Sequence, residues 1–325
     1  MSKKTILVVG GAGYIGSHVN EMLQQTGYNT VVLDNLSRGS PQAVHRGILI
    51  KGESANQDLL NKIFTEYQID AVMHFAALTD VGESMIAPLK YHHNNVANTI
   101  TLLNAMQQHQ IKIFIFSSTA AIFGMPQTKK ISEDHPCNPI NPYGNSKWLV
   151  EKILDDLVRA NQIKCGCLRY FNAAGGDPRG NIKSLIMSRK ETNLIPIILR
   201  SLKEKKSAVS IYGTDYPTPD GTCVRDYIHI EDLGTAHILL MEKLFSGMES
   251  TNFNLGNGEG FSVRQVIATA EHVTGLKVNA IESDRRPGDP PILLADSRKA
   301  EQILGWQRKY PSLDIMIKHA WEAMN

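Results

Sequence analysis

Short apolar runs alternate with longer amphipathic stretches through the first half of the chain. Each run has the length of a β-strand, and the stretches between them have the length and period of helices. Regular alternation of this kind implies right-handed crossovers, so it predicts an α/β fold built on a doubly wound parallel sheet. The expected strands are residues 5–9, 30–33, 48–51, 71–75, 113–116 and 165–170.

The pattern changes after Asn172. The segment AAGGDPRGNI is rich in glycine and proline, and short helical segments, turn-rich loops and an expected strand at residues 209–212 follow it. We interpret this part as a second, smaller α/β domain over the C-terminal edge of the sheet. A helix-like segment at 231–244 and a strand-like segment at 252–255 are expected to return to the main domain. The predicted domains are therefore 1–172 with a return segment at 227–255, and 173–226 with 256–325.

Length and charge narrow the class of protein. A chain of 325 residues is long enough for about two domains. Its formal net charge is +2, and it has no basic run beyond the short KEKK stretch. The sequence therefore shows no cluster of positive charge of the kind that binds nucleic acid or a membrane surface. The N-terminus lacks the long apolar region of a signal peptide, and no apolar stretch could span a bilayer. We therefore expect a cytoplasmic protein that binds neither nucleic acid nor membranes.

The cysteines show neither CxxC spacing nor a nearby histidine ligand pattern. A metal site or a disulfide framework is therefore not expected, and buried free thiols are. The residues concerned are Cys137, Cys165, Cys167 and Cys223.

The first expected strand ends in the glycine-rich segment GGAGYIGSHVNEML, which opens a helix. Such glycines let the backbone turn sharply and approach a pyrophosphate, while the helix N-terminus offers free N–H groups. A turn without a ligand is the alternative, but Asp34 stands about 20 residues beyond the loop, where an acidic residue accepts hydrogen bonds from the adenosine ribose. This predicts a Rossmann-type site for NAD rather than NADP. The candidate contacts are Gly10, Gly13, Tyr14, Ile15, Gly16, Asp34 and Asn35.

Tyr143 and Lys147 lie four residues apart in NPYGNSKWLVEKIL. Asn141 is a suitable N-cap and Pro142 a suitable first helical residue, so the phenol and the ammonium should share one face near the start of a helix. A free tyrosine titrates near ~10, and making it a base near neutrality requires about 4 kcal/mol of stabilisation of the phenolate. A nearby lysine could supply part of it and a cationic cofactor more. An exposed helix face with this spacing by chance is the alternative.

Together, the glycine loop and the Tyr-x-x-x-Lys pair resemble the extended short-chain dehydrogenase/reductase superfamily. A colinear series of further segments closely resembles its UDP-glucose 4-epimerase family, among the NAD-dependent epimerases and dehydratases, over nearly the whole chain. These segments are HFAALTDVGES (74–84), NNVANTITLLNAM (94–106), FSSTAAIFG (116–124), LRYFNAAGG (168–176) and YPTPDGTCVRDYIHIEDL (216–233).

The resemblance implies a mechanism. Tyr143 would remove the proton from the sugar 4-hydroxyl as the C4 hydride passes to NAD+, and Lys147 would bind the nicotinamide ribose and lower the tyrosine's pKa. Thr119 would hydrogen-bond the same sugar oxygen. The 4-keto intermediate would take the hydride back on its other face, so tightly bound NAD+ is regenerated while UDP-galactose and UDP-glucose interconvert. The family also implies a homodimer, formed through the helix around residues 95–106 and the Tyr143 helix.

Binding roles carry over to further positions. Phe75 and Ala76 would lie along the cofactor, and Asn94 would approach its phosphates, with a satisfied helix asparagine as the alternative. The other cofactor positions implied are Glu53, Ser54, Ala77, Ser117 and Tyr170, the last orienting the nicotinamide. Substrate contacts implied are Asn172 on the sugar nucleotide, and Asn193, Leu194, Arg225, Arg286 and Asp289 on the UDP moiety. Guanidinium groups suit a diphosphate because they bind it as a bidentate fork. For Arg225, a structural ion pair with Asp226 or another carboxylate is the alternative.

Three positions are notable for substrate and cofactor binding. Thr79 stands where the family implies a lysine contacting the cofactor phosphates, and Glu53 stands where an aspartate usually reads the adenine, so both could loosen NAD binding. Leu293 in PPILLAD is the candidate pocket-size gate, although Ile292 and Leu294 lie one register step away. A branched side chain there should crowd an N-acetyl group, which favours UDP-glucose and UDP-galactose.

Other functions remain as alternatives. One is another UDP-sugar epimerase, for N-acetylhexosamines or pentoses, and another is a sugar-nucleotide dehydratase or decarboxylase on the same scaffold. A dehydratase needs an acid/base pair of carboxylates beside the serine or threonine at this position, but the two residues after Thr119 are Ala120 and Ala121. A non-catalytic dinucleotide sensor would have no reason to keep Tyr143, Lys147 and the diphosphate-binding residues together.

Overall fold

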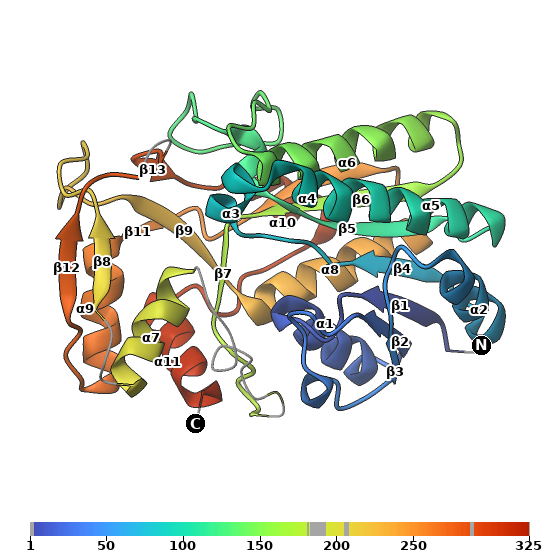
Figure 1. Cartoon of the computed structure of the whole chain (residues 1–325), viewed down its shortest axis with the longest axis horizontal. Coiled ribbons are helices and arrows are strands. Elements are labelled where there is room, and N and C mark those ends of the chain that lie inside the picture. The colour runs from blue at the N-terminus through green and yellow to red at the C-terminus, as the bar shows by residue number, and fades with distance from the viewer. Residues whose placement is uncertain (1–2, 181, 183–192, 205–207, 287–288, 325) are drawn as a thin grey trace.

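The computed structural model describes residues 3–180, 182, 193–204, 208–286 and 289–324. Its large sheet consists of β1 (Thr5–Val9), β2 (Asn29–Asp34), β3 (Ile48–Lys51), β4 (Ala71–His74), β5 (Ile113–Thr119), β6 (Lys164–Tyr170) and β10 (Thr251–Leu255). The strands lie in the order β10-β6-β5-β4-β1-β2-β3, and every pairing between neighbours is parallel. The predicted doubly wound sheet is confirmed (Figure 1).

Helices cover both faces of this sheet. On one face lie α2 (Gln57–Tyr67), α5 (Asn98–Gln108) and α6 (Pro142–Arg159), and on the other α1 (Tyr14–Gln25) and α8 (Ile230–Phe245). Alternate residues of β1 show how the sheet is sandwiched, since Leu7 packs in the first layer and Ile6 in the second. Strands buried on both faces form continuous apolar runs, which is why the sequence revealed them.

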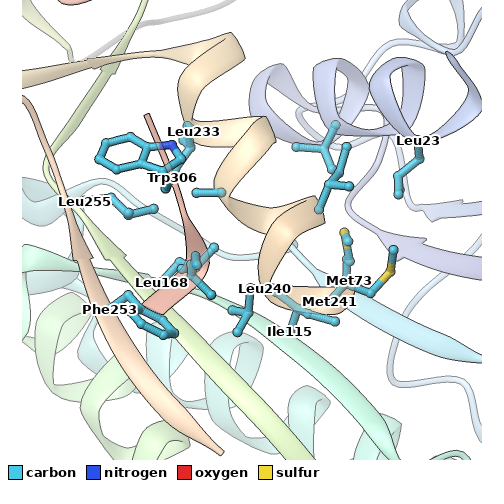
Figure 2. Packing of buried hydrophobic residues seen from close by; sticks show 14 of the residues in the cluster. Leu23, Met73, Ile115, Leu168, Leu233, Leu240, Met241, Phe253, Leu255 and Trp306 are labelled. Atoms are coloured by element: carbon cyan, nitrogen blue, oxygen red, sulfur yellow. The ribbon is translucent and has the colours of Figure 1, made fainter. Parts of the chain in front are cut away.

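Within the predicted return segment, residues 227–255, helix α8 and strand β10 belong to the large sheet and its cover, whereas residues 227–229 end strand β9 (Val224–His229) of a separate small sheet. Strand β10 pairs with β6, with Phe253 opposite Leu168. Figure 2 shows these two side chains beside α8, with Trp306 near Leu233 at one end of the cluster. The indole N–H of Trp306 is buried and donates to the Asp232 carbonyl at 2.8 Å. The edge of the large sheet is thus made by chain that follows only the first part of the predicted second domain, residues 173–226.

The part of the chain predicted as a second domain forms small sheets and an apolar cluster of its own. A four-stranded sheet joins β7 (Asn172–Ala174), β9 (Val224–His229), β11 (Gly260–Ser262) and β13 (Ile292–Leu293), while β8 (Val209–Tyr212) pairs with β12 (Ala280–Ser283). Helices α7 (Leu194–Glu204), α9 (Val263–Thr274) and α11 (Leu313–Ala323) pack against them around a separate apolar cluster. Strand β9 runs directly into α8, so one continuous segment connects the two cores.

The remaining elements are α3 (Val81–Ile86), α4 (Pro88–His92), α10 (Arg298–Leu304), a π-helical turn at His93–Ala97, and 3₁₀ turns at Pro41–Ala43 and Ala120–Phe123. None of the helices in the described ranges is long and apolar enough to cross a membrane. The four cysteines are free, and three are buried as expected. Cys137 is only partly buried, because it lies in the irregular stretch that precedes α6.

Candidate active site

The loop after β1 is shaped by close backbone approach. Gly10 has φ +80°, and a Cβ there would lie 2.5 Å from the Ala76 nitrogen, in the segment after β4. A Cβ on Gly16 would lie 2.3 Å from the Gly10 carbonyl oxygen. Both positions therefore require glycine. Gly13 is the N-cap of α1 and has no side chain to cover the first N–H groups, which leaves a helix N-terminus suited to an anion.

A pocket opens beside this loop, at the carboxyl ends of β1, β2 and β4. Most of the predicted cofactor residues line it, namely Gly10, Gly13, Asp34, Asn35, Glu53, Ser54, Phe75, Ala76, Ala77 and Asn94. The sequence did not single out the lining residues Ser37, Arg38, Gly39 and Gly52. Asn35 donates to the Glu53 carboxylate at 3.1 and 3.2 Å. Although a glutamate replaces the usual aspartate here, a carboxylate therefore still lies at this end of the pocket.

Asp34 holds the glycine loop to the end of β2. Its carboxylate is 8% exposed and accepts hydrogen bonds from the backbone N–H of Ala12 at 3.0 Å and of Leu36 at 2.8 Å. A carboxylate has about four acceptor sites, so lone pairs remain for ribose hydroxyls. The residues fit a dinucleotide for three reasons that meet at this pocket. A Cβ on Gly10 or Gly16 would collide with neighbouring backbone atoms, so the glycine loop leaves room for a ligand. The N-terminus of α1 has no side-chain cap, and the Asp34 carboxylate is held in place by backbone N–H groups.

Three predicted cofactor residues at the start of α1 do not line this pocket. The Tyr14 hydroxyl donates to the Gly175 carbonyl at 2.7 Å, across to the second domain. Ile15 packs against the core under α8, and Gly16 is buried against Gly10. In the described structure they shape the loop and its link to the second domain.

The predicted catalytic residues come together at the carboxyl ends of β5 and β6. The Asn141 side chain accepts the Gly144 N–H at 2.8 Å, which confirms the predicted cap of α6 and sets Tyr143 and Lys147 in its first turns. The Lys147 ammonium is buried, donates to the Ser117 carbonyl at 2.8 Å and lies 4.6 Å above the Phe116 ring. Tyr143 is hydrogen-bonded to the Thr119 side chain.

Tyr170 completes this group of side chains. Its hydroxyl lies 2.6 Å from the Ser117 hydroxyl. Burial raises its pKa, and the neighbouring Tyr143 raises it further, so Tyr170 stays neutral beside the candidate base. Pairwise polar interactions thus connect the five residues in series, in the order Thr119, Tyr143, Tyr170, Ser117 and Lys147.

The protein itself does not make Tyr143 a stronger acid. Burial raises the pKa of Tyr143, and the hydrogen bond with Thr119 lowers it only in part. Burial also lowers the pKa of Lys147 to about 7, against the opposing charge of Glu151 one turn away. The predicted depression of the tyrosine's pKa by Lys147 is therefore not achieved by the chain alone, because the ammonium is itself desolvated and directed at the Ser117 carbonyl.

A buried ion pair that the sequence did not reveal supports this group from below. Arg169 binds the Glu151 carboxylate through two nitrogens, at 2.6 and 3.1 Å, and the Ser118 hydroxyl donates to the same carboxylate at 2.5 Å. Glu151 is 1% exposed and Arg169 4%. Since Ser118 stands between Ser117 and Thr119, the pair links α6, β5 and β6 directly beneath the candidate site.

Asn95 is a second residue that the sequence did not single out. It is buried in the π-helical turn, where it donates to the Leu78 carbonyl at 3.0 Å and the Ser146 hydroxyl at 2.9 Å. Its side-chain oxygen accepts the Leu78 N–H and the Asn94 amide, each at 2.9 Å. One side chain therefore joins the loop after β4, which lines the pocket, to the helix that carries Lys147. In the sequence, Asn95 is marked only as part of the polar pair Asn94-Asn95 at the start of a largely apolar helical segment.

On the substrate side, several predicted residues meet near β9. Arg225 pairs with Asp289 at 3.1 Å and donates to the Pro290 carbonyl at 2.8 Å. The alternative partner Asp226 is instead occupied by the N–H groups of residues 257, 258 and 295. Leu293 is the strand partner of Arg225 and packs against the cluster around Phe123, whereas Leu294 is buried.

Other predicted substrate residues surround this group less closely. The Asn172 amide donates to the Asp226 carbonyl at 2.8 Å. The exposed Arg286 guanidinium lies 3.8 Å above the Tyr212 ring. Asn193 is exposed directly before α7, and Leu194 packs against the core of the second domain.

Comparison with known proteins agrees with this geometry. Residues 6–256 match the NAD dependent epimerase/dehydratase family. A UDP-glucose 4-epimerase of Halalkalibacterium halodurans is 48% identical over 316 residues, covering 97% of this chain and 94% of that protein. The crystal structure of UDP-glucose 4-epimerase from Brucella ovis in complex with NAD is 41% identical, with a TM-score of 0.94 over 99% of this chain and 98% of that one. The Bifidobacterium longum UDP-glucose 4-epimerase, in complex with NAD+ and UDP, is 35% identical, with a TM-score of 0.90 and 98% coverage of both chains. The chain belongs to the NAD dependent epimerase/dehydratase family.

Proposed function

We propose that this protein is a UDP-glucose 4-epimerase that interconverts UDP-galactose and UDP-glucose with bound NAD. The observation that carries the proposal is the meeting of Tyr143, Thr119 and Lys147 beside a dinucleotide pocket. The similarity to UDP-glucose 4-epimerases over nearly the full chain supports the same reaction. The cytoplasmic location predicted from the sequence is part of this proposal.

In this mechanism Tyr143 exchanges a proton with the sugar 4-hydroxyl, while the hydrogen at C4 leaves as a hydride. NAD supplies the hydride acceptor and a positive charge near the nicotinamide ring. Thr119 is placed to donate a hydrogen bond to the phenolate, since its contact lowers the pKa of Tyr143. Lys147, held by the Ser117 carbonyl, is placed to bind ribose hydroxyls and to add positive charge. The 4-keto sugar regains both hydrogens, so the net redox change is zero.

The UDP moiety would bind near β9 and β13. Arg225 and Arg286 would face the diphosphate, and the pair of Arg225 with Asp289 holds one guanidinium in place. The structural role of that ion pair is compatible with substrate binding, because a guanidinium has five N–H donors. Asn172, Asn193 and Leu194 remain proposed contacts of the sugar nucleotide.

Turnover of UDP-galactose tests the function. Purified protein should form UDP-glucose without added reductant or oxidant. A stable 4-keto-6-deoxy product would instead support a dehydratase, against which the 3₁₀ turn after Thr119 argues, because its first residues are Ala120 and Ala121. Absence of turnover with retained nucleotide binding would support a non-catalytic sensor.

Leu293 is expected to limit the size of the sugar 2-substituent. Its branched side chain packs against the cluster of Ala120, Ile122 and Phe123, which directly follows Thr119, so an N-acetyl group on a sugar bound beside Thr119 would compete with it for space. We expect UDP-N-acetylgalactosamine to be turned over at least about tenfold less efficiently than UDP-galactose, and Leu293→Ala to reduce that ratio. The kcat/KM values of both substrates measure it. Ile292→Ala, one register step away, is the matched control, and equal ratios in all three proteins would contradict the prediction.

We also propose a homodimer through α5 and α6. Apolar side chains stand exposed on these helices and on the adjoining α3 and α4, which is unusual for one face of a monomer. They include Ile100, Leu149, Met85, Ile86 and Leu89, and Ile86 and Leu89 are 86% and 82% exposed. A two-fold axis between the helices would bury the same patch on both subunits.

Changing Ile100 and Leu149 to Asp is expected to give a monomer, because each dimer would bury four charges without partners. Light scattering after gel filtration should report about 36.0 kDa for this variant and twice that mass for the unmodified protein. Ile281→Asp, an exposed isoleucine on β12, is the control and should leave the dimer intact. A monomeric unmodified protein would refute the proposed assembly.

A further inference from the structure

Arg38 lines the cofactor pocket with a partly exposed side chain, and no sequence motif indicates a role for it. Among the described residues that line the pocket, it is the one lysine or arginine, and the other ionisable ones are Asp34 and Glu53. Without Arg38 this lining would carry negative charge alone. A dinucleotide brings two further negative charges on its diphosphate, so the charge of Arg38 matters for binding.

The loop that carries Arg38 is held against the glycine loop. The Ser40 N–H donates to the Ala12 carbonyl at 3.0 Å. A Cβ at Gly39 would lie 2.8 Å from Ala12, so glycine is needed for the two loops to approach this closely. Arg38 therefore starts from the wall of the pocket formed by the ends of β1 and β2.

Its guanidinium reaches the opposite wall. It contacts the Thr79 hydroxyl at 3.4 Å and the Glu83 carboxylate at 3.9 Å, and both residues follow β4. Leu78, directly before Thr79, lines the pocket from that side. One side chain thus spans the cleft between the β2 loop and the start of α3.

The anchor at Glu83 is itself well held. Its carboxylate accepts hydrogen bonds from Lys90 at 2.6 Å and from the Tyr91 hydroxyl at 2.9 Å. These contacts hold the pKa of Glu83 below its usual value, Lys90 acting most strongly, so the carboxylate stays charged near neutrality. The contacts with Thr79 and Glu83 engage only two of the five guanidinium N–H groups. The others are available to an anion in the pocket.

We propose that Arg38 binds the diphosphate of NAD and, through Thr79 and Glu83, closes the cofactor cleft so that NAD is released slowly. The inference rests on the proposed binding of NAD in this pocket. It also changes the meaning of Thr79. The lysine that the family implies at position 79 is absent, but the Arg38 guanidinium reaches Thr79 from the opposite wall. Arg38 thereby replaces that lysine as the positive charge that contacts the cofactor phosphates.

The test is the rate of cofactor exchange. Protein loaded with isotope-labelled NAD is chased with excess unlabelled NAD, and the retained label is followed with time. Arg38→Ala should exchange at least about tenfold faster than the unmodified protein, since a charge-assisted contact is lost. Arg38→Lys should recover part of the difference, because it keeps the charge but not the fork. Raising the salt concentration should speed exchange more in the unmodified protein than in Arg38→Ala.

Arg46→Ala is the matched control. Arg46 belongs to the same connection between β2 and β3, is similarly exposed and pairs with Glu21 at 3.6 Å outside the pocket lining. It should leave exchange unchanged. Equal exchange in Arg38→Ala and the unmodified protein, or equal acceleration by Arg46→Ala, would overturn the role of Arg38 while leaving NAD binding in place. Failure of the unmodified protein to hold any label would overturn both proposals.

Discussion

Replacing Tyr143 with Phe is expected to lower kcat for UDP-galactose by about 10²–10⁴-fold, the usual contribution of a positioned acid or base. The phenyl ring keeps the volume of the side chain, so the affinity for UDP-sugar should change little. The hydroxyl that Thr119 contacts is the only group removed. Initial rates give kcat, and calorimetric titration with UDP-glucose gives the affinity.

Tyr67→Phe is the matched control for this variant. Tyr67 ends α2 and packs against the core on one face of the large sheet, so its hydroxyl has no part in the proposed chemistry. It should retain full activity. A Tyr143→Phe variant with unchanged kcat would mean that another group moves the proton, whereas loss of UDP-sugar affinity together with kcat would assign Tyr143 to binding.

Arg169→Ala is expected to destabilise the folded protein by about 3–5 kcal/mol, because it leaves the Glu151 carboxylate buried without its counter-charge. Both side chains are almost fully buried, and the pair has two direct N–H to carboxylate contacts. The midpoint of urea unfolding, measured with saturating NAD for every variant, reports the change.

Two comparisons distinguish the stability lost by leaving a buried charge unpaired from the stability lost by removing any arginine. Arg159→Ala removes an exposed ion pair with Asp156 at the end of α6 and should change stability by no more than about 0.5 kcal/mol. Changing Arg169 and Glu151 together to Met should restore much of the loss, since no buried charge is left unpaired. Equal effects of Arg169→Ala and Arg159→Ala would refute the explanation.

The large sheet was predictable because its strands are apolar on both faces. The end of β5 was not. The expected strand stopped at 116, but Ser117 and Thr119 continue it, because their backbone pairs with Leu168 and Tyr170 of β6. Pairing with a neighbouring strand decided the conformation of these polar residues, and no local pattern carries that information.

The small sheet of the second domain was beyond prediction for a related reason. Its strands β7 and β11 have three residues each and β13 has two, which is too short for a period to be read. The sheet depends on pairing between segments as distant as Asn172 and Tyr227. Such pairings appear only once the chain has folded.

Within the site, the sequence was most informative where one segment holds the functional residues. Tyr143, Lys147 and their cap lie in seven consecutive residues, so spacing and helix geometry were enough. Glu151 and Arg38 were missed because a charged residue is ordinarily exposed, and only the partners on β6 and α3 make these two different. The raised pKa that Tyr143 has in the chain alone could not be predicted from the sequence, because desolvation depends on everything packed around the phenol.

The position of β10 has a consequence for the order in which the protein folds. Strand β6, which ends in Tyr170, acquires its second neighbour only when residues 251–255 pair with it. During synthesis the preceding six strands are complete some 80 residues earlier, and β6 is then an open edge with unpaired N–H and C=O groups. The large sheet therefore cannot be completed on the ribosome until residues 173–250 have also been made. The edge beside Tyr170 is the last part of the sheet to become paired.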